Sequence, residues 1–288
     1  QEGMFVVLGV TGHTGKVVAE TLLAQNQPVR VVVRSADQGE QWRTKGADVA
    51  VASLDDGPSL TRAVQGASGL YLLIPPNYGA SAWLSEQRER MDRAVAAIKA
   101  GGVEHVVLLS SVGAQLSDGT GPIRAVQYGE QQLRAAMRNV TALRPCYFME
   151  NWAIGLGMVR GQGVLPTFIA PQARIPMIST GDIGRVAADR LMAGGPGHVI
   201  VELAGPEEYS PEQVAEEFGR ILGRAVRTQA APLSAVVPTM TSFGFSDEAA
   251  RLFEEMYTAF AKGTIVYEFP NALVRGTISL AEAVRGMA

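Results

Sequence analysis

Short apolar runs alternate with helical patterns through the first half of the chain. Runs rich in valine, leucine and isoleucine predict strands at Met4–Val10, Val29–Val33, Val49–Ala52, Leu70–Ile74, Val106–Leu109 and Val140–Leu143. Between these runs, apolar positions with the helical period predict helices at Lys16–Ala24, Ser59–Gln65, residues 84–98 and Ile123–Met137. Strands separated by helices of this length predict right-handed crossovers, a parallel sheet and therefore an α/β fold.

The pattern loosens in the second half, where four glycines between residues 155 and 163 exclude a long regular element. Helices are predicted at Asp182–Met192, Ser210–Leu222 and Ser246–Lys262, and a strand at His198–Leu203. The helix at Ser210 has the clearest start, because this serine can cap it, Pro211 takes the first position and Gln213 completes a capping box. We expect residues 151–288 to form a smaller α/β lobe for a substrate or partner, packed on the first part and not an independent domain.

A glycine-rich loop follows the first predicted strand and precedes the first predicted helix. Its G-x-x-G-x-x-G pattern is weakly specific in a chain with 32 glycines, but its position is where backbone N–H groups and the positive helix end bind a pyrophosphate. Gly9 permits a tight turn, Gly12 lets the backbone approach phosphates, and Gly15 lets the helix pack on the strand. The loop predicts a doubly wound parallel Rossmann sheet over residues 1–150. Its expected dinucleotide-binding residues are Gly9, Thr11, Gly12, His13, Thr14 and Gly15.

The end of the second predicted strand distinguishes between two cofactors. NAD sites usually place a carboxylate there to hold the ribose hydroxyls, whereas this strand is followed by Arg34 and Ser35. A guanidinium stabilises a 2′-phosphate through charge-assisted hydrogen bonds, although an arginine that is only solvated at the surface is the alternative. Asp37 lies beyond the strand end. The expected cofactor is therefore NADP(H), bound in part by Arg34 and Ser35.

Five further segments occur in a fixed order after predicted strands and in the second half. They are Ser53–Asp56, Ile74–Pro76, Leu109–Ala114, Leu143–Asn151 and Ile175–Ile183. Together with the glycine loop and Arg34, they make the sequence resemble the NmrA-like family of atypical short-chain dehydrogenases/reductases. The resemblance covers nearly the whole chain.

This resemblance implies roles for residues that follow the carboxyl ends of the strands, where ligands bind in open parallel sheets. The implied cofactor residues, from the adenine toward the nicotinamide, are Ser53, Leu54, Asp55, Ile74, Pro75, Ser110, Tyr147 and Phe148. The implied substrate residues are Phe148, Asn151 and Trp152. Core packing between the lobes is the alternative for Phe148 and Trp152.

The helix after the fifth strand lacks the Tyr-x-x-x-Lys pair that dehydrogenases of this superfamily use for proton transfer. Alignment on its Glu130 places Pro122 and Val126 at those positions, and neither side chain can transfer a proton. Tyr128 is followed four residues later by a glutamine, which carries no charge to lower the phenol pKa, so an ordinary helix tyrosine is the alternative. The candidate catalytic residues are Ser110, Ser111 and Tyr128.

Charge and spacing argue against several other classes of function. The net charge is −3 with no block of Lys or Arg, so direct nucleic-acid binding has little support, and the apolar runs are too short to span a membrane. His13, His105 and His198 lack metal-ligand spacing, so no metal is expected. Cys146 is the one cysteine and cannot form an intrachain disulfide, which favours a cytoplasmic location.

Two functions remain open at this point. The first is an NADPH-dependent reductase of a small hydrophobic quinone, enone or carbonyl compound. A quinone can take its proton from water, so such a reductase tolerates the missing pair. The second is a non-catalytic NADP(H) redox sensor that regulates a protein partner, as the resemblance implies for some relatives. Monomer and homodimer both stay open.

Overall fold

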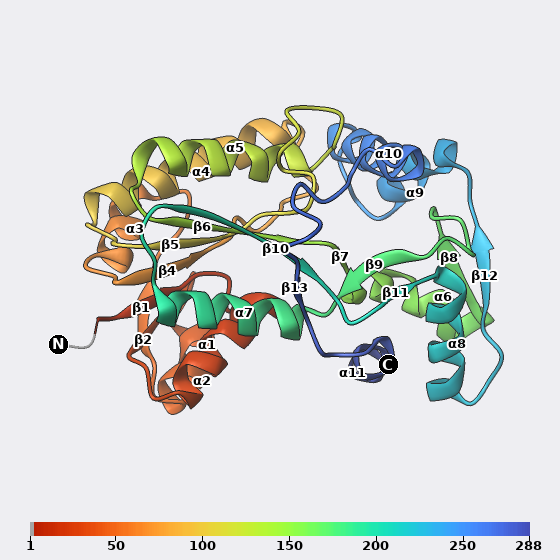
Figure 1. The fold of residues 1–288 in the computed structure, drawn as a ribbon, viewed down its shortest axis with the longest axis horizontal. Coiled ribbons are helices and arrows are strands. Elements are labelled where there is room, and N and C mark those ends of the chain that lie inside the picture. Colours follow the sequence, from red (N-terminus) through yellow and green to blue (C-terminus); the bar gives the residue numbers. More distant parts are fainter. Residues whose placement is uncertain (1–2) are drawn as a thin grey trace.

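An eight-stranded sheet forms the centre of the computed structural model, which describes residues 3–288 (Figure 1). The strands are β1 (Phe5–Val7), β2 (Val29–Val33), β3 (Asp48–Val51), β4 (Gly69–Leu72), β5 (Val106–Leu109), β6 (Val140–Pro145), β10 (His198–Ala204) and β13 (Val274–Arg275). They pair in the order β13-β10-β6-β5-β4-β1-β2-β3, and every pairing is parallel. This order confirms the predicted doubly wound Rossmann sheet.

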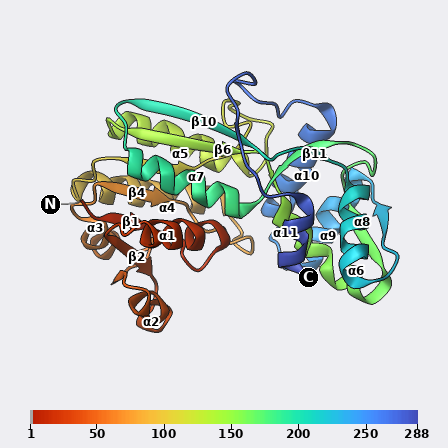
Figure 2. The same ribbon diagram turned by 60° about the horizontal axis from the view of Figure 1, so that its bottom comes forward.

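Helices cover both faces of this sheet (Figure 2). One face packs against α1 (His13–Ala24), α2 (Ala36–Thr44) and α7 (Thr180–Ala193), and the other against α3 (Gly57–Val64), α4 (Trp83–Ala100) and α5 (Ile123–Ala136). In the central strand β1, Val7 joins the core under the first face and Val6 the core under the second. Both valines are fully buried, which explains why these strands appear in the sequence as continuous apolar runs.

The chain after residue 150 is divided between the main sheet and a smaller layer. Strands β10 and β13 extend the main sheet, and α7 lies beside α1. The remaining elements gather at one end of the sheet (Figure 1). They are β7 (Tyr147–Phe148), α6 (Leu156–Gln162), β8 (Val164–Thr167), β9 (Ile175–Ile178), β11 (Glu208–Tyr209), α8 (Pro211–Leu222), β12 (Arg227–Ala230), α9 (Val236–Ser242), α10 (Asp247–Lys262), α11 (Leu280–Met287) and the short 3-10 helices Met149–Gly155 and Leu233–Ala235. Both sides of residue 150 thus contribute to one sheet, and the boundary itself stays a prediction.

The predicted and observed elements agree most closely in the first half. Strands β2 and β5 have the predicted bounds, whereas β1 ends at Val7 because Gly9 has φ = +73° and turns the chain away from the sheet. Helix α2 is missing from the prediction. Its sequence is mostly polar, and Trp42 is the one large apolar residue that marks its buried face. The capping box predicted for α8 is present, with Ser210 and Gln213 bonded reciprocally. Among residues 3–288, no helix is long and apolar enough to cross a membrane.

Candidate cofactor and substrate site

The glycine loop joins β1 to α1 in a turn that has no space for larger residues. A Cβ on Gly9 would lie 2.7 Å from the Leu73 side chain, and a Cβ on Gly15 would lie 2.2 Å from the Gly9 carbonyl oxygen. Helix α1 begins at His13, and its capping residue Gly12 has no side chain to bond the first free N–H groups. The loop therefore presents backbone donors and the positive helix end at the carboxyl edge of the sheet.

The predicted loop residues do not all have free side chains. Thr11 and His13 are exposed, but Thr14 is buried and its hydroxyl accepts a hydrogen bond from the Tyr71 hydroxyl at 2.7 Å. This bond holds the Thr14 side chain in the core between α1 and β4. Thr14 therefore offers a ligand its backbone N–H and not its hydroxyl.

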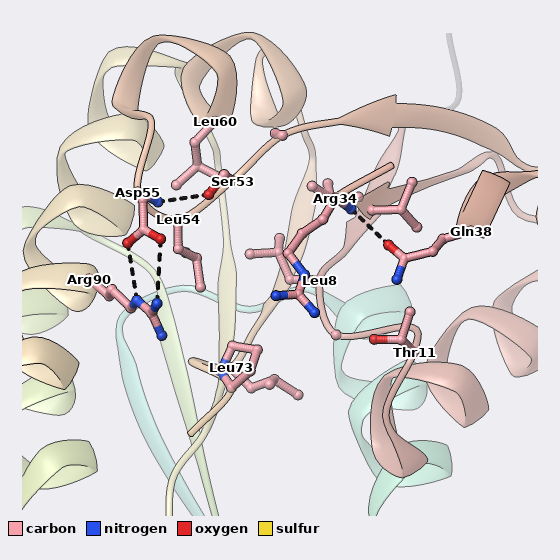
Figure 3. Close-up of a pocket in the computed structure, with 15 residues that line it drawn as sticks. Leu8, Thr11, Arg34, Gln38, Ser53, Leu54, Asp55, Leu60, Leu73 and Arg90 are labelled. Carbon is pink, nitrogen blue, oxygen red and sulfur yellow. Dashed lines mark hydrogen bonds and ion pairs between the residues drawn. The ribbon is translucent and has the colours of Figure 1, made fainter. Parts of the chain in front are cut away.

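A first cavity lies beside the glycine loop, bounded by the segments that follow β1, β2, β3 and β4 (Figure 3). Figure 3 shows Arg34 between Thr11 and Gln38 on one side and the Ser53–Asp55 segment on the other. The other residues that line the first cavity are Leu8, Gly9, Val32, Val33, Ala52, Leu60, Leu73, Pro75 and Arg90. Seven predicted cofactor residues therefore share this cavity: Gly9, Thr11, Arg34, Ser53, Leu54, Asp55 and Pro75.

Arg34 is the exposed cation of the first cavity. Its backbone N–H donates to Gln38 Oε1 at 3.2 Å, and no carboxylate of residues 3–288 forms an ion pair with its guanidinium. Ser35 is exposed and precedes α2 in an extended conformation. An unpaired guanidinium at the end of β2 is free to bind an anionic group.

Asp55 is paired with arginines of α4 across the first cavity. Arg90 donates from Nε to Asp55 Oδ1 at 3.2 Å and from Nη2 to Oδ2 at 3.4 Å, and Arg93 donates to Oδ1 at 3.4 Å. The sequence prediction missed Arg90 and Gln38, although both line the cavity. Arg90 belongs to α4, which reaches this site only through the packing of the fold, so its local sequence does not mark it. Gln38 belongs to α2, a helix that the sequence did not predict.

Two predicted cofactor residues after β4 have different surroundings. Ile74 is half-buried and packs against the core below α3 and α4. Pro75 is exposed, lines the first cavity and accepts a hydrogen bond from Gln87 Nε2 at 3.3 Å. The segment is therefore held in place next to the glycine loop.

The two candidate serines after β5 are bonded within the protein. Ser110 is buried and its hydroxyl donates to Glu130 Oε1 at 2.7 Å, while the Ser111 hydroxyl donates to the Val112 carbonyl at 2.9 Å. Arg144 Nε and Nη2 bind the two oxygens of Glu130 at 2.8 Å each, and Arg144 Nη1 also binds Glu268. Ser110 thus belongs to a buried ionic network, and this arrangement argues against a proton-transfer function for it.

Tyr128 lies between α4 and α5. Its hydroxyl donates to Asp92 Oδ1 at 2.6 Å, and this hydrogen bond raises the pKa of the phenol. The Arg88 guanidinium lies 5.3 Å from the centre of the Tyr128 ring. Tyr128 lines neither the first cavity nor the cleft described next, so its position argues against the predicted catalytic function.

An apolar cleft extends beyond the end of β6, where β9 and α10 of the smaller layer contribute to its walls. It consists of two adjoining cavities of about 480 and 490 Å³, both of which are lined by Tyr147, Phe168, Ile169 and Tyr257. The first half is lined, among others, by Val112, Cys146, Ile175, Phe260 and Tyr267. The second half is lined, among others, by Asn151, Trp152, Met158, Met240 and Phe243. Among the described residues that line the cleft, Glu208 is the one with a charged side chain.

The predicted substrate residues have different positions relative to this cleft. Asn151 and Trp152 line it, and the Tyr147 and Trp152 rings lie 5.7 Å apart. Phe148 does not line it and packs against the core of the main sheet, which is the alternative considered for this residue. The neighbouring Cys146 thiol is buried, and this burial raises its pKa to about 11.

Tyr147 and Tyr257 meet where the two halves of the cleft join. Their hydroxyl oxygens are 3.5 Å apart, and burial raises the pKa of both phenols. The sequence prediction missed Tyr257, which lies 110 residues from Tyr147 on α10. Both phenols are therefore neutral near neutral pH and can donate hydrogen bonds.

A protein-family model and several known proteins match this chain. A model of the NmrA-like family matches residues 1–279. The chain is 25% identical over 256 residues to an NAD(P)H azoreductase of Xenophilus azovorans, covering 88% of this chain and 86% of the relative. It is 26% identical over 292 residues to quinone oxidoreductase 2 of Escherichia coli (strain K12), covering 98% and 97%.

Solved structures share the fold. The NADPH complex of the Escherichia coli NADPH-dependent quinone oxidoreductase has a TM-score of 0.80 at 23% identity, over 99% of both chains. The NADP(H) complex of the Citrobacter sp. triphenylmethane reductase also has a TM-score of 0.80, at 19% identity, over 99% of this chain and 100% of that chain.

Proposed function

The chain belongs to the NmrA-like family, and on that premise we propose that it is an NADPH-dependent reductase of small, uncharged quinones, enones or carbonyl compounds. One observation carries this proposal: the apolar cleft lies at the same carboxyl edge of the sheet as the glycine loop and Arg34. The names of two relatives, an azoreductase and a quinone oxidoreductase, agree with a small unsaturated substrate.

The residues at this edge fit NADP(H). In the proposed complex, the pyrophosphate binds the N–H groups between Gly12 and Gly15, the adenine enters the first cavity beside Leu54, and Arg34 binds the 2′-phosphate. NADPH supplies a hydride, and the protein holds donor and acceptor together. Residues 1–150 would then hold the cofactor, and residues 151–288 would supply most of the cleft. We place the protein in the cytoplasm, where its single buried thiol stays reduced.

Loss of NADPH absorbance tests the reaction. Purified protein is mixed with NADPH and menadione, with an aryl enone, or with a simple ketone, and each rate is compared with the rate without substrate. We expect menadione and the enone to be reduced faster than the ketone, because the ketone depends most on a protein acid. Rates equal to the background for all three compounds, in the presence of tight NADPH binding, would overturn the proposal.

A second candidate function is an NADP(H) sensor that regulates a protein partner. It is favoured because the hydroxyls of the candidate catalytic residues Ser110, Ser111 and Tyr128 all donate hydrogen bonds within the protein. The two functions predict different results in a co-purification experiment. A sensor captures a partner from cell extract with NADPH alone or with NADP⁺ alone, whereas a reductase shows no such dependence. A monomer and a homodimer are both compatible with the two functions.

A further inference from the structure

Two phenol groups stand where the halves of the apolar cleft meet, and they carry an inference that rests on the proposed function. Tyr147 lies just beyond β6, Tyr257 belongs to α10, and both line the two halves of the cleft. Their hydroxyl oxygens are 3.5 Å apart, and either can act as the donor. Because one hydrogen bond between two hydroxyls uses one of the two protons, the other proton is available to a ligand.

The shared wall offers little else that is polar. Phe168 and Ile169 complete the part that is common to both halves. The nearby Thr167 hydroxyl donates to the Ile169 carbonyl oxygen at 2.8 Å and accepts from the Ile169 backbone N–H at 2.9 Å. In the first half, the Tyr267 hydroxyl is buried and has no hydrogen-bond partner among the described residues, and the same holds for the Trp152 indole N–H in the second half. Each of these two groups lines one half only, whereas the Tyr147 and Tyr257 hydroxyls are the donors that line both halves.

We propose that Tyr147 and Tyr257 form the polar recognition point of the cleft, where one hydroxyl donates a hydrogen bond to the carbonyl oxygen of the bound acceptor. The ligand class is an uncharged, conjugated acceptor with an oxygen next to an apolar ring. Such a bond strengthens as negative charge develops on that oxygen. The bond thereby orients the acceptor, whereas the proton that a Tyr-x-x-x-Lys pair would transfer comes from solvent.

The reaction balances with solvent as the proton source. For a quinone, the hydride brings two electrons to the conjugated ring, and the negative charge develops on the oxygen bonded by the phenol pair. Solvent supplies the proton, so that quinone, NADPH and one proton give hydroquinone and NADP⁺. The phenols orient the acceptor and end the cycle with their own protons in place.

Paired ligands separate a hydrogen bond from simple packing. Menadione carries carbonyl oxygens, whereas 2-methylnaphthalene has the same fused rings and methyl group without them. Binding of each is measured by equilibrium dialysis against NADP⁺-saturated protein, which cannot turn over. The variants are Tyr147→Phe and Tyr257→Phe. The matched control is Tyr78→Phe, which removes a half-buried phenol hydroxyl that does not line the cleft.

We expect each cleft variant to weaken menadione binding about 3- to 10-fold, which corresponds to one neutral hydrogen bond. Binding of 2-methylnaphthalene should change less than about twofold, and the control should change neither value. Unchanged menadione binding in both cleft variants, or an equal loss for both ligands, would overturn the inference. So would a wild-type protein that binds no menadione.

The outcome separates this inference from the proposed function. If the wild-type protein binds menadione, the variants bind it more weakly as expected, and NADPH is not oxidised, the inference about the phenol pair stands and the proposed reductase function is refuted. If the protein reduces menadione and the variants bind it as tightly as the wild type, the reductase function stands and the inference about the phenol pair is refuted. Unfolding midpoints of all variants, measured with NADP⁺ present, exclude misfolding as the cause.

Discussion

At the scale of single residues, Arg34 allows the most specific test of which cofactor binds. It is exposed at the end of β2, and no carboxylate of residues 3–288 neutralises it. We expect Arg34→Ala to weaken NADPH binding by about 1.5–3 kcal/mol, because hydrogen bonds to a charged group are lost. NADH binding should change little, since NADH has no 2′-phosphate. Fluorescence titration with both cofactors checks this, with Arg43→Ala on the nearby helix α2 as the control. Equal losses for both cofactors would show that Arg34 does not bind the 2′-phosphate.

Gly15 tests the shape of the loop. A Cβ there would lie 2.2 Å from the Gly9 carbonyl oxygen and 2.8 Å from the Leu8 carbonyl oxygen, and backbone atoms cannot rotate away as a side chain does. We expect Gly15→Ala to lower the free energy of unfolding by about 1–3 kcal/mol, the usual cost of overpacking. Chemical denaturation measures it. Gly57→Ala is the control, because a Cβ at that position meets nothing within 4 Å. Similar stabilities for the two variants would contradict the close approach of α1 to β1.

At the scale of elements, a buried ionic network joins β6 to α5 and to the segment before β13. Arg144 and Glu130 are almost fully buried and bonded at 2.8 Å, and Arg134 binds the same carboxylate at 3.1 Å from a more exposed position. We expect Arg144→Ala to destabilise the protein by about 3–5 kcal/mol, because it breaks a buried ion pair and leaves the Glu130 carboxylate with the partly exposed Arg134 as its one cationic partner. Arg134→Ala should cost about 0–1 kcal/mol, as an exposed pair does. Thermal and urea unfolding compare the two, and equal losses would contradict a buried network.

The elements also show how far the sequence predicts the site. Strands β2 and β5, the glycine loop and Arg34 were predictable, because apolar runs and glycine spacing are local properties of the chain. Tyr257 was not, since it reaches Tyr147 only through the packing of α10 against the smaller layer. Ser110 was predicted near the cofactor, but the local sequence gives no sign of the Glu130 carboxylate that binds its hydroxyl. Short strands such as β7 and β11 also have no periodic pattern to predict them.

At the scale of the whole molecule, the sheet edge combines a cofactor side that carries a free cation with an apolar cleft that has none. The cleft wall is mainly aromatic and aliphatic with a few neutral polar side chains, and its one charged side chain among the described residues is Glu208. Arg34 belongs to the first cavity and not to this wall. An anionic substrate would therefore lose its hydration in the cleft without gaining a cationic partner. The architecture favours uncharged acceptors.

Charge selectivity follows from this separation. We expect a naphthoquinone sulfonate to bind at least about tenfold more weakly than menadione, because the sulfonate must be partly desolvated without a partner. Glu208→Gln should narrow this difference by about two- to fivefold, since Glu208 is exposed and its repulsion is screened by solvent. Glu207→Gln is the control, because Glu207 precedes Glu208 in the chain but does not line the cleft. The ratio of kcat/KM for the two quinones measures the effect. Equal ratios for wild type and Glu208→Gln would show that Glu208 does not act on the substrate. Equal kcat/KM for the two quinones in the wild-type protein would place substrate binding outside the apolar cleft.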